Sequence, residues 1–186
     1  NVLQESDIIL KTSDKEMVLS NMKKLLYDEK AVQRADLPAM QSESLASVHI
    51  SSLASKYSVT DKADGERVFL IIMNERLYII NNNLHVKEVP NTGYKNLSTY
   101  NNTIIDGEYI FIEKLNKFIF LGFDILYYKN TDVRKEPELE KRLNMLNNIM
   151  KDAFEIKASH ESYSNKTSKI SMDDMIAYYT KNIIEY

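Results

Sequence analysis

The segment Lys62–Arg67, of sequence Lys-Ala-Asp-Gly-Glu-Arg, combines an amine, a glycine turn and a cation within six residues. It lies between the strand-like run Tyr57–Thr60 and the apolar run Val68–Met73. A lysine in such a place can project into a cleft while backbone amides approach a phosphate. Burial and the neighbouring Arg67 would lower the lysine pKa, so that a fraction is free amine able to attack phosphorus. The alternative is a surface turn with solvated charges.

A second candidate is Asp106-Gly107-Glu108, which lies inside an apolar run. Two acidic side chains within a strand cost free energy unless they meet a cation or a hydroxyl group. A ribose hydroxyl, Mg²⁺ or Arg67 would each serve as that partner. The alternative interpretation is a β-bulge with a structural ion pair.

The third candidate is Phe123, which stands between Gly122 and Asp124 in a further apolar run. The glycine permits close approach, and the ring of Phe123 could present its face to a nucleobase. An aromatic residue in a strand is more often part of the core, and the residue pattern alone favours that interpretation.

Strands are expected to position all three candidates. The runs Val68–Met73 and Arg76–Ile80 flank Asn74-Glu75, which suits a tight hairpin turn. Thr103–Glu113 and Lys117–Tyr128 form a second predicted hairpin. Both hairpins are rich in Ile, Phe, Tyr and Val, which predicts a largely antiparallel sheet.

Helical spacing appears on both sides of these strands. Ser13 and Glu16 form a capping-box pattern ahead of an apolar face. The residues of that face are Val18, Met22, Leu25 and Leu26. A second helix is expected after Pro137, with Lys141-Arg142 on its solvated face, and a third from Ser171. Helices that flank an antiparallel sheet predict the α+β class.

The composition excludes several classes of protein. The chain has 186 residues, of which 44% are hydrophobic and 27% charged, as in a globular protein. Its apolar runs are too short to span a bilayer, and no secretory pattern is visible. The absence of cysteine excludes disulfides and fits a reducing compartment, so we expect a cytoplasmic protein that is not secreted and contacts no membrane. A net charge of −3 argues against a simple nucleic-acid-binding module but not against an enzyme.

The order of the three candidates resembles motifs I, III and IIIa of the covalent nucleotidyltransferase superfamily, which includes mRNA capping guanylyltransferases and ATP- or NAD-dependent ligases. The resemblance covers about residues 57–186. Within the superfamily the chain is most similar to capping enzymes of large DNA viruses. Residues 57–67 look like their motif I segment, and Leu77–Leu84 like the strand and turn that follow. Phe123–Tyr128 with Asp132-Val133-Arg134 is shared by both branches.

This resemblance implies a role for each candidate residue. Lys62 would be the catalytic nucleophile, which forms a lysyl-nucleotide phosphoamide. The implied nucleotide-binding residues are Thr60, Asp61, Arg67, Asp106, Gly107, Glu108 and Phe123. Among them, Arg67 and Glu108 would contact the ribose, Glu108 would also bind the metal, and Phe123 would stack on the purine. The backbone of Thr60 and Asp61 would read the base edge.

The resemblance also implies a fold and a domain arrangement. Residues 46–186 would form an antiparallel-sheet nucleotidyltransferase core of the ATP-grasp-like ligase and capping type, behind an N-terminal helix and connecting stretch in residues 1–45. Motifs IV to VI and the OB-fold domain that carries motif VI do not appear in the sequence. We therefore expect a piece of a longer enzyme that is inactive or very weak alone. Triphosphatase and methyltransferase domains could be present in the parent chain.

The implied reaction transfers GMP from GTP, with Mg²⁺ or Mn²⁺, through lysyl-GMP to the diphosphate 5′ end of RNA. Two alternatives stay open on the motifs alone. One is an ATP-dependent DNA or RNA ligase that works through lysyl-AMP, and the other is a non-catalytic, partner-binding module on the same scaffold. Asn82 stands where metazoan capping enzymes have an arginine, which leaves one expected ribose or phosphate contact unaccounted for.

Overall fold

The computed structural model of the chain describes residues 2–3, 10–27, 64–90, 93–113 and 117–154. The chain divides into two compact units, and all of these residues belong to the unit made of residues 1–43 and 63–156. The predicted strand before Lys62, the boundary between residues 45 and 46, and the predicted helix from Ser171 lie outside the described residues.

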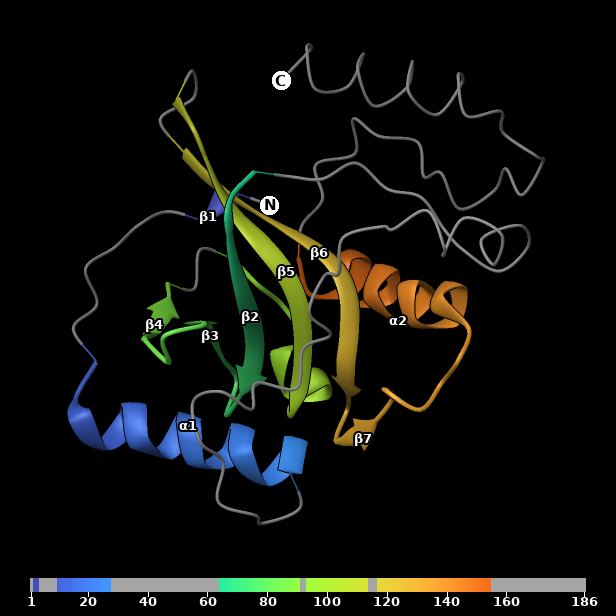
Figure 1. Cartoon of the computed structure of the whole chain (residues 1–186), viewed down its shortest axis with the longest axis horizontal. Helices are drawn as coiled ribbons and strands as arrows, with labels where there is room; N and C mark the ends of the chain where they lie inside the picture. The colour runs from blue at the N-terminus through green and yellow to red at the C-terminus, as the bar shows by residue number, and fades with distance from the viewer. Residues whose placement is uncertain (1, 4–9, 28–63, 91–92, 114–116, 155–186) are drawn as a thin grey trace, which may run out of the picture. The chain divides into compact units, whose positions relative to one another are not determined.

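The described part of the chain contains a seven-stranded sheet (Figure 1). Its strands are β1 (Val2–Leu3), β2 (Glu66–Met73), β3 (Arg76–Asn81), β4 (Val86–Val89), β5 (Thr103–Ile112), β6 (Lys117–Tyr128) and β7 (Thr131–Asp132). The order is β1-β6-β5-β2-β3-β4, with β7 paired to β6. All these pairings are antiparallel, so the two predicted hairpins, β2–β3 and β5–β6, are confirmed and lie side by side through the β2–β5 pairing.

The turn between β2 and β3 follows from its two residues. Asn74 and Glu75 both have positive φ, at 50° and 61°. Two-residue hairpin turns of this kind match the right-handed twist of the flanking strands. The backbone N–H of Glu75 donates to Oδ1 of Asn101, 3.2 Å away, which ties the turn to the chain that leads into β5.

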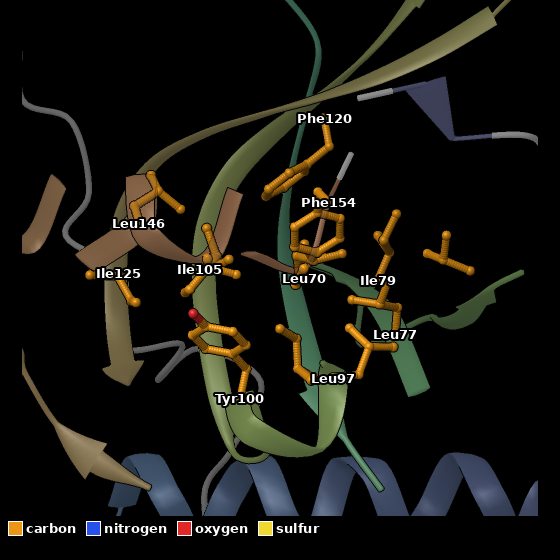
Figure 2. Close-up of a cluster of buried hydrophobic side chains, with 14 of the residues drawn as sticks. Leu70, Leu77, Ile79, Leu97, Tyr100, Ile105, Phe120, Ile125, Leu146 and Phe154 are labelled. Atoms are coloured by element: carbon orange, nitrogen blue, oxygen red, sulfur yellow. The ribbon is translucent and has the colours of Figure 1, made fainter. Parts of the chain in front are cut away.

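A helix covers each face of the sheet. Helix α1 (Thr12–Tyr27) packs Val18, Met22 and Leu26 into one cluster of buried side chains. Helix α2 (Leu139–Asp152) and the 3₁₀ helix η3 (Leu97–Tyr100) pack into a second cluster (Figure 2). Successive residues of β2 alternate between the clusters because side chains of a strand point to opposite faces in turn. The α+β class is therefore confirmed. No helix among the described residues is long and apolar enough to cross a membrane.

The helix starts differ slightly from the predicted ones. Because α1 begins at Thr12, Ser13 and Glu16 lie within its first turns and do not form the predicted capping box. The carbonyl of Lys11 instead accepts the first hydrogen bonds of the helix. Pro137 precedes α2, whose N-cap is Glu138, and so it does not occupy the first turn.

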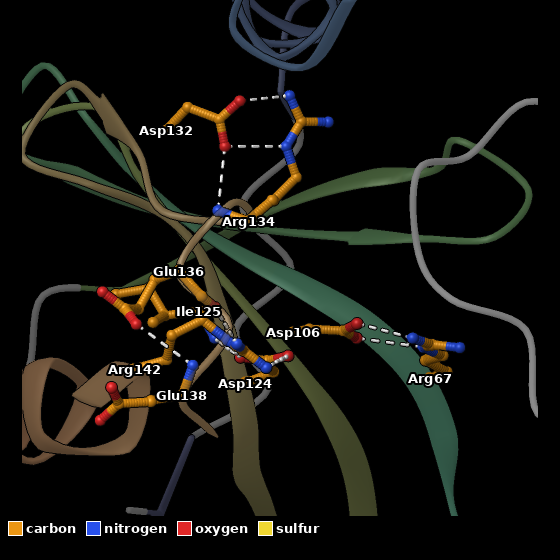
Figure 3. Close-up of polar contacts among 9 residues, drawn as sticks. All are labelled: Arg67, Asp106, Asp124, Ile125, Asp132, Arg134, Glu136, Glu138 and Arg142. Atoms are coloured by element: carbon orange, nitrogen blue, oxygen red, sulfur yellow. Dashed lines mark hydrogen bonds and ion pairs between the residues drawn. The ribbon is translucent and has the colours of Figure 1, made fainter. Parts of the chain in front are cut away.

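Arg134 connects the end of α1 to the sheet. Its Nε and Nη2 donate to the two carboxylate oxygens of Asp132, over 3.0 and 2.7 Å (Figure 3). Its Nη1 donates to the backbone carbonyl of Leu26, 2.9 Å away. The last carbonyls of a helix have no partner within the helix, so this contact satisfies one of them. The hydrogen bonds from Arg134 also hold the pKa of Asp132 below its ordinary value.

We expect Arg134→Lys to lower the free energy of unfolding of the chain by about 1–2 kcal/mol. A lysine ammonium cannot donate to both oxygens of Asp132 and reach Leu26 at the same time. Urea denaturation followed by circular dichroism measures the change. As a matched control, Arg76→Lys should leave the free energy of unfolding nearly unchanged, because the side chain of Arg76 is 57% exposed and its ion pair with Glu88 is 3.7 Å long. Equal losses in both variants would contradict the anchoring role of Arg134.

Candidate functional site

An ion pair joins β2 to β5 near the start of β2. Nε of Arg67 donates to Oδ1 of Asp106 over 3.0 Å, and Nη2 donates to Oδ2 over 2.6 Å (Figure 3). The side chain of Asp106 is 4% exposed and that of Arg67 is 25% exposed. Burial raises the pKa of Asp106, and the hydrogen bonds from Arg67 oppose that shift. Of the three partners predicted for the acidic pair, the structure therefore contains Arg67.

Glu108 lies directly opposite Arg67 in the β2–β5 register. Its Oε1 accepts a hydrogen bond from the backbone N–H of Gly65 over 3.0 Å. A Cβ atom on Gly65 would lie 2.6 Å from the carbonyl oxygen of Tyr109 and 2.9 Å from Cγ of Glu108. Glycine is therefore required for this close approach. The contact fixes the backbone three residues after Lys62.

Gly107 has a packing role between its two acidic neighbours. The ring of Phe120 occupies the space where a Cβ atom would lie, and the carbonyl oxygen of Leu121 is 2.5 Å from that position. Gly107 pairs with Gly122 across the two strands, and the register shifts between Asp106 and Gly107. Both features of the alternative interpretation, the β-bulge and the structural ion pair, are thus present. Neither excludes a bound ligand.

Phe123 is the extra residue of this bulge, because Gly107 pairs with Gly122 and Asp106 pairs with Asp124. Its side chain is 39% exposed, so the core position favoured by the residue pattern is wrong. Cζ of Arg67 lies 5.6 Å from the centre of the Phe123 ring, within the range of a cation–π contact.

The structure therefore brings four of the predicted residues together on one part of the sheet. These residues are Arg67, Asp106, Glu108 and Phe123. Arg67 lies two residues before the buried Phe69, which belongs to the cluster beneath α1. The alternation of a strand puts both side chains on the same face of the sheet. The site therefore lies on the same face of the sheet as α1, beyond the side chains that are buried beneath that helix.

Arg142 was predicted on the solvated face of α2, and this prediction is wrong. Its side chain is 12% exposed and donates from Nε to Oδ1 of Asp124 over 2.8 Å. The signal for burial was present in the sequence, because Arg142 lies one helical turn before Leu146 and two before Ile149, both of which are buried. Asp124 is thereby held toward α2, whereas the adjacent Phe123 lies beside Arg67.

A metal site can be tested against the described residues. They contain no group of three or more His, Asp or Glu side chains that could hold a metal ion. Mg²⁺ in nucleotide enzymes is commonly bound by one or two carboxylates together with substrate phosphates. The half-buried carboxylate of Glu108 fits that pattern as a single protein ligand. Lys62, Thr60 and Asp61 lie outside the described residues, and their roles stay predictions.

Comparison with known proteins gives one matching family, described as mRNA capping enzyme, catalytic domain, whose model matches residues 4–185. The chain is 30% identical over 188 residues to the probable mRNA-capping enzyme of Acanthamoeba polyphaga mimivirus, across all of this chain and 16% of that protein. It is 33% identical over 114 residues to the mRNA-capping enzyme of an African swine fever virus isolate from Kenya, across 60% of this chain and 12% of that protein. The chain thus spans less than a fifth of the length of these relatives. The predicted likeness to capping enzymes of large DNA viruses is confirmed.

We expect Arg67→Met to lower the free energy of unfolding at neutral pH by about 3 kcal/mol, because it leaves a buried carboxylate without its cation. Asp106→Asn should lower the free energy of unfolding by less than Arg67→Met does, since the Arg67 left without a partner is partly exposed and can be hydrated. The deficit of Arg67→Met should shrink as pH falls towards 3.8, the ordinary pKa of an aspartate, because a protonated Asp106 needs no cation.

Urea denaturation of the chain over a range of pH measures both effects. The control is Glu66→Gln, at the same end of β2, whose exposed carboxylate accepts a hydrogen bond from Asn81. The free energy of unfolding of this variant should stay close to that of the unmodified chain at each pH. A deficit of Arg67→Met that does not change with pH would contradict the burial of an ionised Asp106.

Proposed function

Because the chain belongs to the family of mRNA capping enzyme catalytic domains, we propose that it is the nucleotide-binding part of an mRNA guanylyltransferase. In the proposed reaction GMP passes from GTP to Lys62 and then to the diphosphate 5′ end of RNA. The observation that carries the proposal is a series of contacts: Glu108 binds the backbone of Gly65, Arg67 lies opposite Glu108, and Phe123 lies beside Arg67. These are the groups that a purine nucleotide needs next to a nucleophilic lysine.

Covalent geometry supports Lys62 as the nucleophile. Three peptide units span at most about 11 Å, so the Cα atom of Lys62 cannot lie farther than that from the Cα atom of Gly65. Gly65 is bound by Glu108, whose cross-strand partner is Arg67. The uncharged form of a lysine is the form that attacks phosphorus.

The chemistry of the other residues suits the rest of the nucleotide. The exposed ring of Phe123 offers a face on which a purine can stack. The carboxylate of Glu108 can accept hydrogen bonds from ribose hydroxyl groups, and the guanidinium of Arg67 can donate to ribose or phosphate oxygens. In this proposal the backbone of Thr60 and Asp61 reads the base edge.

The reaction consists of two displacements at the same phosphorus atom. The amine of Lys62 attacks the α-phosphorus of GTP in line, loses a proton, forms a P–N bond and releases pyrophosphate. A terminal phosphate oxygen of the RNA then attacks the same phosphorus, and the P–N bond breaks to return the lysine. Mg²⁺ or Mn²⁺, with Glu108 as its protein ligand, would offset the negative charge of the phosphates. Arg67 and Phe123 act by holding the nucleotide in place, and no acid–base residue is required of them.

The remainder of the machinery would lie elsewhere in a longer polypeptide. The chain spans 16% of the mimivirus relative, which leaves room for many further domains. We propose that these include the nucleotidyltransferase motifs IV to VI and an OB-fold domain, and that the 186-residue piece alone has little activity. Triphosphatase and methyltransferase domains would complete such an enzyme, which would act in the cytoplasm of an infected cell or in the virion.

The full-length enzyme, incubated with labelled GTP and Mg²⁺, should retain the label through a denaturing gel. Lys62→Ala should abolish this labelling, because the amine that forms the P–N bond is gone. Lys87→Ala, which removes an exposed lysine of β4, serves as the control and should be labelled like the unmodified enzyme. Labelling by ATP but not GTP would indicate a ligase, and normal labelling of Lys62→Ala would exclude Lys62 as the nucleophile.

Phe123→Ala should raise the KM for GTP in lysyl-GMP formation about tenfold, because base stacking on an aromatic ring is worth about 1–3 kcal/mol. Initial rates of adduct formation at a series of GTP concentrations measure it. Phe111→Ala is the matched control: Phe111 is 45% exposed on the neighbouring strand β5, and its ring contacts Phe118 instead of Arg67. Similar KM changes in the two variants would contradict a base site on Phe123.

A further inference from the structure

The bulge in β6 leaves Phe123 without a partner in the ladder. Residues on either side of it pair with β5, through Gly122 to Gly107 and Asp124 to Asp106. The extra residue of a bulge is not fixed by ladder hydrogen bonds as its neighbours are. A ring that must present one face to a nucleobase therefore needs support from another part of the fold.

The carboxylate of Asp124, the residue after Phe123, accepts three hydrogen bonds. Nε and Nη2 of Arg142 donate to its two oxygens over 2.8 and 3.2 Å (Figure 3). The backbone N–H of Ile125 donates to Oδ1 over 2.8 Å. The side chains of Arg142 and Asp124 are mostly buried, at 12% and 18% exposed. Charge-assisted, two-point hydrogen bonds of this kind are strong and directional.

Arg142 is itself held by a well-packed helix. Its Nη1 donates to the backbone carbonyl of Glu136, just before α2. One and two turns farther along α2, Leu146 and Ile149 are buried in the cluster that contains Ile125. Figure 2 shows Leu146 and Ile125 in this cluster. Arg142 thereby fixes the bulge in β6 at a defined position relative to α2.

The same contact balances the charges beneath the site. Figure 3 shows Arg142, Asp124, Asp106 and Arg67 in a row, with one arginine at each end and two carboxylates between them. The negative charge of Asp124 raises the pKa of Asp106, which burial has already raised. Without Arg142, Asp124 and Asp106 would share a single arginine and repel each other.

We propose that Arg142 is a positioning residue, which holds Asp124 and thereby the bulge that presents the ring of Phe123 to the nucleobase. The inference rests on the proposed function, because it assigns Arg142 to the same nucleotide site. Arg142 does not touch the nucleotide in this arrangement and acts through Phe123.

A double-mutant cycle on the full-length enzyme tests this role. Arg142→Gln should raise the KM for GTP in lysyl-GMP formation by about tenfold, with a smaller change in kcat, since a displaced ring loses most of its stacking. Arg142→Lys should give a KM between those of the unmodified enzyme and Arg142→Gln, because lysine keeps the charge but not the two-point contact with Asp124. When Phe123 is already alanine, Arg142→Gln should change KM by less than about twofold, because no ring is left to position. Lys141→Gln, on the exposed side of the same helix, should leave KM unchanged.

The outcomes separate the inference from the proposed function. An equal rise in KM from Arg142→Gln with and without the Phe123 ring would overturn the positioning role, and so would no rise at all. A Phe123→Ala enzyme with unchanged KM would instead remove the proposed base site. If circular dichroism shows that Arg142→Gln does not fold, Arg142→Lys replaces it in the same cycle under the same criterion.

Discussion

The partly buried ion pair between Arg67 and Asp106 is the contact on which the rest of the site depends. A carboxylate inside an apolar strand is tolerated when a cation neutralises it, and Arg67 supplies that cation from the neighbouring strand. Because the pair spans β2 and β5, it fixes the start of β2 next to Glu108, which in turn binds Gly65. The pair also holds the guanidinium beside the ring of Phe123. One interaction between two strands thus orders a cation, a carboxylate and an aromatic ring.

The sheet builds this site where its regular pairing is interrupted. Gly107 faces Gly122 across the strands, and the ring of Phe120 fills the space above Gly107. Immediately next to this pair, β6 carries one residue more than β5, so that both Phe123 and Asp124 oppose Asp106. The ring of Phe123 remains exposed for a ligand, while Arg142 of α2 binds the carboxylate of Asp124. Local irregularity, supported by a helix on the opposite face, gives the site its shape.

The two hairpins and the two described helices could be predicted because each follows from a short-range pattern. Arg67 was one of three partners predicted for the acidic pair, because two carboxylates in an apolar strand need a cation or a hydroxyl group. The exposure of Phe123 could not be predicted, since it depends on a bulge set by the pairing of distant strands. Arg142 shows an intermediate case. Its spacing from Leu146 puts it on the buried stripe of α2, but its charge favoured a solvated position. Strands of two to four residues, such as β4 and β7, are too short to show a period of two.

The most direct test is to locate the covalent nucleotide on the full-length enzyme. After incubation with GTP and Mg²⁺, the protein is digested under alkaline conditions that preserve the P–N bond, and the peptides are sequenced by tandem mass spectrometry. The proposed mechanism predicts GMP on Lys62, three residues before Gly65. GMP on a lysine of another segment, with Lys62 unmodified, would contradict this account.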